Sequence, residues 1–103
     1  MIIVMTTVST ASDAETLAEA IVNAKLAACL QILPPMTSVY VWKGKVQKES
    51  EHLLLIKTLP EKWDELTAFI TANHSYEVPE IVAVDAENVA KPYRAWLGSV
   101  LKV

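Results

Sequence analysis

The chain has 103 residues, 52% of them hydrophobic, and a formal net charge of −3 at pH 7. This composition predicts one folded domain over residues 1–103 and excludes a disordered chain. The acidic balance without a basic cluster speaks against nucleic acid as a partner, and no apolar run is long enough to cross a membrane. One cysteine forms no internal disulfide, and the first residues lack the charged region of a signal peptide, so we expect a cytoplasmic protein.

The first elements alternate between strand and helix. Residues 2–8 are rich in β-branched side chains, which predicts a short buried strand. Residues 12–25 place apolar side chains at helical spacing, behind a capping box formed by Ser12 and Glu15. Residues 27–42 contain no charge and favour a second strand, which two consecutive prolines interrupt.

The second half of the chain repeats this order. Lys43-Gly44 predicts a tight turn into a third strand over residues 45–58, because glycine adopts positive φ at little cost. Pro60 suits the first turn of a second helix, and residues 81–84 form a short buried strand. Pro92 opens a final helix with an apolar stripe.

Two βαβ units joined by a hairpin predict a particular fold class. We expect an α+β protein with a ferredoxin-like split βαβ sandwich (βαββαβ), an additional C-terminal helix and the strand order 4-1-3-2. The alternative is a doubly wound parallel sheet. It requires a longer crossover between the second and third strands than this chain provides.

The second strand is the most informative element for assembly. In the predicted topology residues 27–42 lie at the edge of the sheet, yet they carry no charge. Exposed edges are normally protected by charged side chains, prolines or bulges. Either the final helix covers this edge within the chain, or another subunit does. We expect another subunit, because a small domain has little else to cover it with.

The chain has none of the common catalytic or nucleotide-binding motifs. It lacks G-x-G-x-x-G, a P-loop, C-x-x-C and H-E-x-x-H. No nucleophile and base can be paired, so we expect no catalytic residues and no enzyme activity. A lone thiol such as Cys29 is typical of a packed core residue, with a soft metal ligand or redox sensor as the alternative. His52 is expected on a solvated strand face beside Glu49 and Glu51.

Polar chemistry concentrates in residues 74–80, His-Ser-Tyr-Glu-Val-Pro-Glu. The segment is either a loop with a proline-fixed entry to the last strand, or a metal or small-molecule site. Imidazole and carboxylate suit copper and zinc, so the candidate metal ligands are His74, Glu77 and Glu80. Antiparallel pairing of the last strand with the first brings their opposite ends together. The candidate ligand-binding residues are therefore Thr6, Thr7 and Tyr76.

Five segments of the sequence, in this order and spacing, resemble the divalent-cation tolerance protein CutA family. They are Leu26-Ala27-Ala28-Cys29, Trp42-Lys43-Gly44-Lys45, Leu54-Leu55-Ile56-Lys57-Thr58, Tyr76-Glu77-Val78-Pro79-Glu80-Ile81 and Tyr93-Arg94-Ala95-Trp96-Leu97. The resemblance covers almost the whole chain. It implies a ferredoxin-like fold, a tight homotrimer joined through long strands and no established enzymatic activity. It also implies an association with tolerance to copper and other divalent cations.

The resemblance leads to two functional hypotheses. The first is a non-enzymatic homotrimer that responds to divalent metal ions, requires no cofactor and binds Cu²⁺ or another divalent cation weakly. The second follows from the likeness of CutA trimers to nitrogen-regulatory PII signalling proteins, which take small ligands in clefts between subunits. Some bacterial members carry a cysteine and two adjacent histidines where this chain has Thr6, Asn73 and His74. The resemblance therefore implies a weakened copper site.

Overall fold

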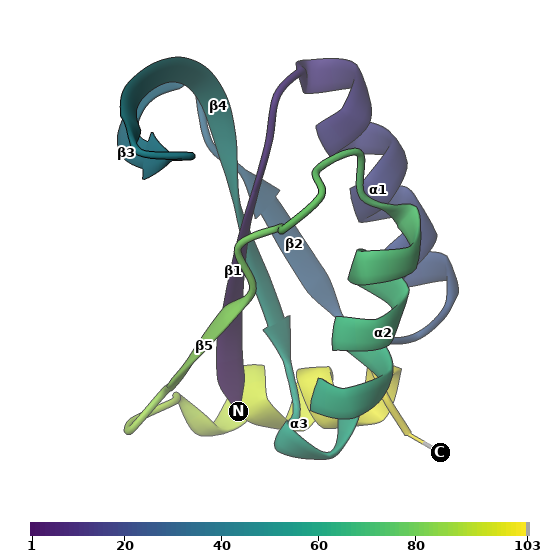
Figure 1. Ribbon diagram of the computed structural model, residues 1–103. Coiled ribbons are helices and arrows are strands. Elements are labelled where there is room, and N and C mark those ends of the chain that lie inside the picture. Colours follow the sequence, from purple (N-terminus) through teal and green to yellow (C-terminus); the bar gives the residue numbers. More distant parts are fainter. Residues whose placement is uncertain (103) are drawn as a thin grey trace.

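The structure, a computed structural model, describes residues 1–102. Its elements are β1 (Ile2–Val8), α1 (Ala11–Asn23), β2 (Cys29–Ile32), β3 (Met36–Trp42), β4 (Lys45–Thr58), the 3₁₀ turn η1 (Pro60–Lys62), α2 (Trp63–Asn73), β5 (Val82–Asp85) and α3 (Lys91–Val100). The strands pair antiparallel in the order β2-β4-β1-β5, and β3 pairs with the first half of β4. Helices α1 and α2 lie together on one face, and α3 crosses one end of the strands (Figure 1). The predicted ferredoxin-like α+β fold with an additional C-terminal helix is confirmed, and the parallel alternative is wrong.

The core lies between the sheet and the pair α1 and α2. Side chains alternate along β1, so every second residue faces these helices, and residues four apart on each helix face the sheet. The fully or nearly fully buried core side chains include Val4, Leu17, Ile21, Leu54, Ile56, Leu66 and Ile70. Each contributes about 1.5–3 kcal/mol by leaving water. This packing fixes the end of β1 beside the end of α2, where the candidate site lies.

The start of α1 differs from the prediction. Thr10 adopts an extended conformation, and its Oγ1 accepts a hydrogen bond from the backbone N–H of Asp13 at 3.0 Å. The capping box assigned to Ser12 and Glu15 is therefore wrong, because Ser12 already lies in the first turn of the helix. An N-cap needs a residue outside the helix whose side chain reaches the third helical residue, and Thr10 meets that condition.

Strands β3 and β4 form a long hairpin beyond the body of the sheet. Trp42 pairs with Lys45, so Lys43 and Gly44 make a two-residue turn, with φ of 51° and 78°. Two positive φ values are the requirement of a type I′ turn, whose twist matches that of the strands. Strand β1 pairs only with residues 52–58 of β4, so residues 45–51 pair with β3 alone. The hairpin lengthens the molecule to 44 Å along its longest axis, against 26 and 23 Å along the others.

Both edges of the sheet expose apolar side chains. Val41 and Val46 at the hairpin tip are 67% and 69% exposed, and Val82 and Val84 of β5 are 47% and 45% exposed. The expectation that the last strand is buried is wrong, because β5 pairs with β1 alone and no helix covers it in the part of the chain described. Helix α3 lies at the end opposite the hairpin (Figure 1). The final helix therefore does not cover the β3 part of the uncharged edge at residues 27–42.

Two further residues lie in unexpected surroundings. His52 is half-buried, and its Nδ1 donates to the carbonyl of Leu33 at 2.9 Å, just before the two prolines that separate β2 from β3. It therefore fastens the end of β2 instead of facing solvent freely. Cys29 is half-buried, not enclosed in the core, and pairs with Lys57 across the sheet.

Between residues 1 and 102 no helix has the length and apolar character needed to cross a membrane.

Candidate functional site

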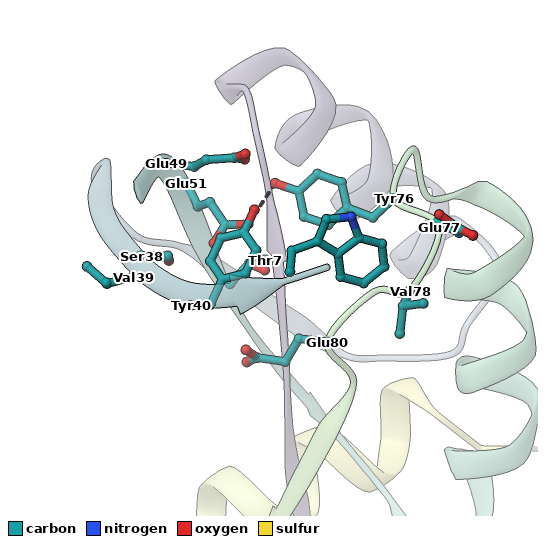
Figure 2. A pocket seen from close by; sticks show the side chains of 11 residues that line it. Thr7, Ser38, Val39, Tyr40, Glu49, Glu51, Tyr76, Glu77, Val78 and Glu80 are labelled. Atoms are coloured by element: carbon teal, nitrogen blue, oxygen red, sulfur yellow. Dashed lines mark hydrogen bonds between the residues drawn. The ribbon is translucent and has the colours of Figure 1, made fainter. Parts of the chain in front are cut away.

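A cleft of about 680 Å³ opens between the β3–β4 hairpin and the loop that joins α2 to β5. Figure 2 shows its walls, which come from the end of β1, from β3, from the first half of β4 and from the loop. Eleven residues line it: Thr7, Ser38, Val39, Tyr40, Trp42, Glu49, Glu51, Tyr76, Glu77, Val78 and Glu80. The hydrogen bond between His74 and the carbonyl oxygen of Thr7 ties the start of this loop to the end of β1. We refer to this cavity as the hairpin cleft.

A buried carboxylate lies in the hairpin cleft. Glu51 is only 6% exposed, and its Oε2 accepts a hydrogen bond from the hydroxyl of Tyr76 at 2.6 Å (Figure 2). Burial by itself raises the pKa of Glu51. Hydrogen bonds donated by Ser38, Tyr76 and Thr7 outweigh burial and lower the pKa below its usual value of 4.5. The group is thus an ionised carboxylate at neutral pH.

Tyr76 has the opposite shift. Burial, the hydrogen bond to Glu51 and the negative charges of Glu51 and Glu49 all disfavour the phenolate, so the pKa of Tyr76 is raised well above its usual 10. Burial and the carboxylate of Glu49 likewise raise the pKa of Tyr40 across the cleft. Both phenols therefore act as neutral hydrogen-bond donors at physiological pH.

His74 holds Tyr76 in place through a hydrogen bond to its backbone N–H and through contact between the two rings. Its Nε2 lies 2.8 Å from the carbonyl oxygen of Thr7, and its Nδ1 lies 3.0 Å from the backbone N–H of Tyr76. A carbonyl only accepts and a backbone N–H only donates, so the ring is the neutral tautomer with its hydrogen on Nε2. The rings of His74 and Tyr76 are in contact, with centroids 4.6 Å apart. Both nitrogens are thus occupied, and coordination of a metal requires one of these bonds to break.

The structure brings some of the predicted site residues together and separates others. Thr7, Tyr76, Glu77 and Glu80 share the hairpin cleft, as the antiparallel pairing of β1 and β5 predicts. Thr6 does not line the cleft. It points to the core on the other face of β1, where its hydroxyl is fully buried and has no hydrogen-bond partner in the described part of the chain. Neighbouring strand residues face opposite sides, so Thr6 and Thr7 cannot share one site.

The predicted metal ligands are not assembled into a metal centre. His74 lines a separate cavity of about 150 Å³ against α1, whereas Glu77 and Glu80 line the hairpin cleft. Nowhere in residues 1–102 do three His, Cys, Asp or Glu side chains come close enough together to hold a metal ion. Metal binding by His74, Glu77 and Glu80 stays a prediction, and it requires a rearrangement or a further ligand.

Glu51, which lies in the hairpin cleft, carries no signal of its role in the sequence. A solvated strand face is expected for His52 beside Glu49 and Glu51, but Glu51 is buried, because Tyr76, 25 positions later in the chain, covers it. The pattern of β4 around Glu49 and Glu51 is polar, which gives no sign of burial. The aromatic residues Tyr40 and Trp42 fit the pattern of a strand, which gives no sign that they line a cleft. The signal that could reveal the cleft is the uncharged run at residues 27–42 before the hairpin turn, because it indicates that β3 needs a partner or a ligand.

The comparisons with known proteins agree with this architecture. Residues 2–100 match the family described as CutA1 divalent ion tolerance protein. The chain belongs to this family. The divalent-cation tolerance protein CutA of Thermus thermophilus is 41% identical over 95 residues, which cover 92% of each protein. The chloroplastic protein CutA of Arabidopsis thaliana is 45% identical over 96 residues, or 93% of this chain and 53% of that protein. The chain spans about half the length of this and the other plant and animal relatives it matches.

Solved structures show the same fold. CutA of Synechococcus elongatus PCC7942 superposes with a TM-score of 0.93 at 38% identity, covering 98% of this chain and 89% of that one. CutA1 of Pyrococcus horikoshii superposes with a TM-score of 0.95 at 31% identity, covering both chains completely. The resemblance first seen in the five sequence segments is confirmed. The family is described by tolerance to divalent ions and not by a reaction.

Proposed function

We propose that this family member acts in the response to divalent cations as a non-enzymatic homotrimer assembled through its β3–β4 hairpin. The observation that carries the proposal is the open hairpin. Within the described residues, β3 has no outer neighbour, and residues 45–51 of β4 have none on the side of β1. Its exposed side chains include Val39, Val41 and Val46. Unpaired apolar strands of this kind associate with another chain unless something covers them.

Two different edges are available for this contact. The hairpin offers one apolar surface, and Val82 and Val84 of β5 offer another at the opposite edge of the sheet. A contact between two unlike surfaces is head-to-tail, and such contacts close into rings when the rotation permits. A ring of three is the arrangement that the CutA resemblance implies, and it leaves no strand edge free.

Light scattering tests the assembly. We expect a particle of about 34 kDa at micromolar concentration, three times the 11.4 kDa of the chain. Val41→Lys places a charge on a side chain that is 67% exposed in the single chain, so it should dissociate the trimer. The matched control is Val22→Lys on α1, where the valine is 39% exposed. A stable folded monomer of the natural chain contradicts the trimer, and an unaffected Val41→Lys trimer contradicts assembly through the hairpin.

The cation-binding part of the proposal places a weak site at residues 74–80. Glu77 and Glu80 supply oxygen ligands, and His74 supplies nitrogen only after losing a backbone hydrogen bond. That loss offsets part of the coordination energy, which is the physical reason for expecting weak affinity for Cu²⁺ or another divalent cation. No cofactor is required. We further propose a cytoplasmic location, consistent with a chain whose one cysteine forms no internal disulfide.

A second candidate function is a PII-like binding module that takes a small metabolite. The observation that favours it is the hairpin cleft, whose 680 Å³ is within the usual range of small-molecule sites, about 300–1,000 Å³. Native mass spectrometry of the protein taken gently from its own cell separates the two functions. A retained metal ion supports the first function. A retained organic molecule supports the second.

A further inference from the structure

Glu51 is a buried negative charge that has no lysine or arginine partner within residues 1–102. Its side chain is 6% exposed, and no lysine or arginine between residues 1 and 102 is among the groups that act on its ionisation. The nearby His74 is held as a neutral ring by two backbone hydrogen bonds. The hydrogen bonds keep this carboxylate ionised, so a positively charged ligand beside it gains a direct electrostatic attraction.

The rest of the hairpin cleft has the same electrostatic preference. Glu49, Glu77 and Glu80 line it, and none of its lining residues is a lysine or arginine in the described chain. Anionic ligands are therefore repelled. The rings of Tyr40 and Trp42 also form part of the wall, and aromatic faces attract cations within about 6 Å of the ring centre. Trp42 already has the ammonium of Lys43 at 6.0 Å from its ring centroid.

The geometry favours an organic cation over a metal ion. A metal needs several ligands within about 2–2.6 Å, and the described residues offer no group of three. Glu49 and Glu77 lie on opposite sides of the cleft (Figure 2). A volume of 680 Å³ is far larger than a bare ion fills. A ligand that carries an ammonium group on an apolar or aromatic body matches the acidic and the aromatic walls of this cavity. Its charge would lie at Glu51 and its body against the rings of Tyr40 and Trp42.

We infer that the hairpin cleft binds a small organic ammonium ion whose charged group lies against Glu51 and whose body packs between Tyr40 and Trp42. The inference rests on the second candidate function and names its ligand class. The hydroxyls of Thr7 and Ser38, which also line the cleft, lie close enough to Glu51 to hydrogen-bond it and so complete a polar surround for the ammonium group.

Binding of a simple probe tests the inference. The probe is 2-phenylethylammonium, and 2-phenylethanol serves as a neutral analogue of nearly the same shape. Saturation-transfer NMR on the natural oligomer should show saturable binding of the amine and none of the alcohol. Glu51→Gln removes the charge with little change of shape, so it should weaken the amine at least about tenfold. Glu65→Gln on the exposed face of α2 makes the same change in net charge away from the cleft and should leave affinity unchanged.

A second variant keeps the test decisive if Glu51→Gln fails to fold. Tyr40→Leu alters an exposed ring and leaves Glu51 in place, so it should weaken the amine about two- to fivefold. Equal binding of the alcohol, or an unchanged affinity in Glu51→Gln, overturns the inference. Absence of amine binding by an intact oligomer also overturns it, whereas the proposed trimer is judged separately by light scattering. Displacement of the amine by an equal concentration of Zn²⁺, in the natural chain but not in Glu51→Gln, would show that the site prefers a metal ion. That result also overturns the inference.

Discussion

The bond between Tyr76 and Glu51 gives the sharpest test of how the hairpin cleft is held together. Tyr76→Phe removes one hydroxyl and keeps the ring that packs on His74. The lost bond is short, 2.6 Å, and ends on a buried charged group. Hydrogen bonds to charged groups contribute about 1.5–3 kcal/mol, so we expect the free energy of unfolding at pH 7 to fall by that amount.

The pH dependence of this loss follows from the pKa of Glu51, which folding lowers from 4.5. A lowered pKa contributes stability that is present above about pH 4.5 and is lost as the pH falls through the folded-state value. The Tyr76 bond is one cause of the lowering, so Tyr76→Phe raises the folded-state pKa towards 4.5. The difference in stability between the natural chain and the variant should therefore shrink as the pH falls below about 4.5.

Urea unfolding followed by tryptophan fluorescence measures both effects, at pH values from 7 to 3 and at one fixed protomer concentration. Tyr40→Phe is the control, because it removes a phenol hydroxyl from the same cleft that makes no hydrogen bond to Glu51. It should leave the acid dependence unchanged. An equal loss for Tyr76→Phe at every pH, or none at pH 7, would refute the assignment of an ionised Glu51 held by Tyr76.

Two further predictions concern the cation site and the hairpin turn. His74→Ala should abolish the weak binding of Cu²⁺ and Zn²⁺ in calorimetric titrations, and an unchanged affinity would place the metal elsewhere. Gly44→Ala should lower the free energy of unfolding by about 1–2 kcal/mol, because Gly44 has φ of +78° although nothing lies within 4 Å of the added methyl group. Gly98→Ala, in helix α3 and equally unobstructed, should instead stabilise the protein by about 0.5–1 kcal/mol, and a loss at Gly98 would contradict this account.

The order and type of the elements could be predicted because they depend on local patterns. β-Branched runs, helical spacing of apolar residues and the Lys43-Gly44 turn each act over a few residues. Antiparallel pairing then follows from the short link between the second and third strands. The same reasoning placed Thr7 beside Tyr76. One error was also local, because Thr10 caps α1 in place of Ser12, two positions away.

The surroundings of individual polar side chains were decided only by the tertiary structure. By itself the sequence determined the ferredoxin-like α+β fold, its strand order and a polar loop at residues 74–80, since these need only periodicity and short connections. Glu51 became a buried charge because a tyrosine 25 residues later covers it, and His74 became a support because its two nitrogens meet backbone groups of β1 and its own loop. Burial and hydrogen-bond partners are properties of contacts between distant segments, and no pattern of neighbouring residues encodes them.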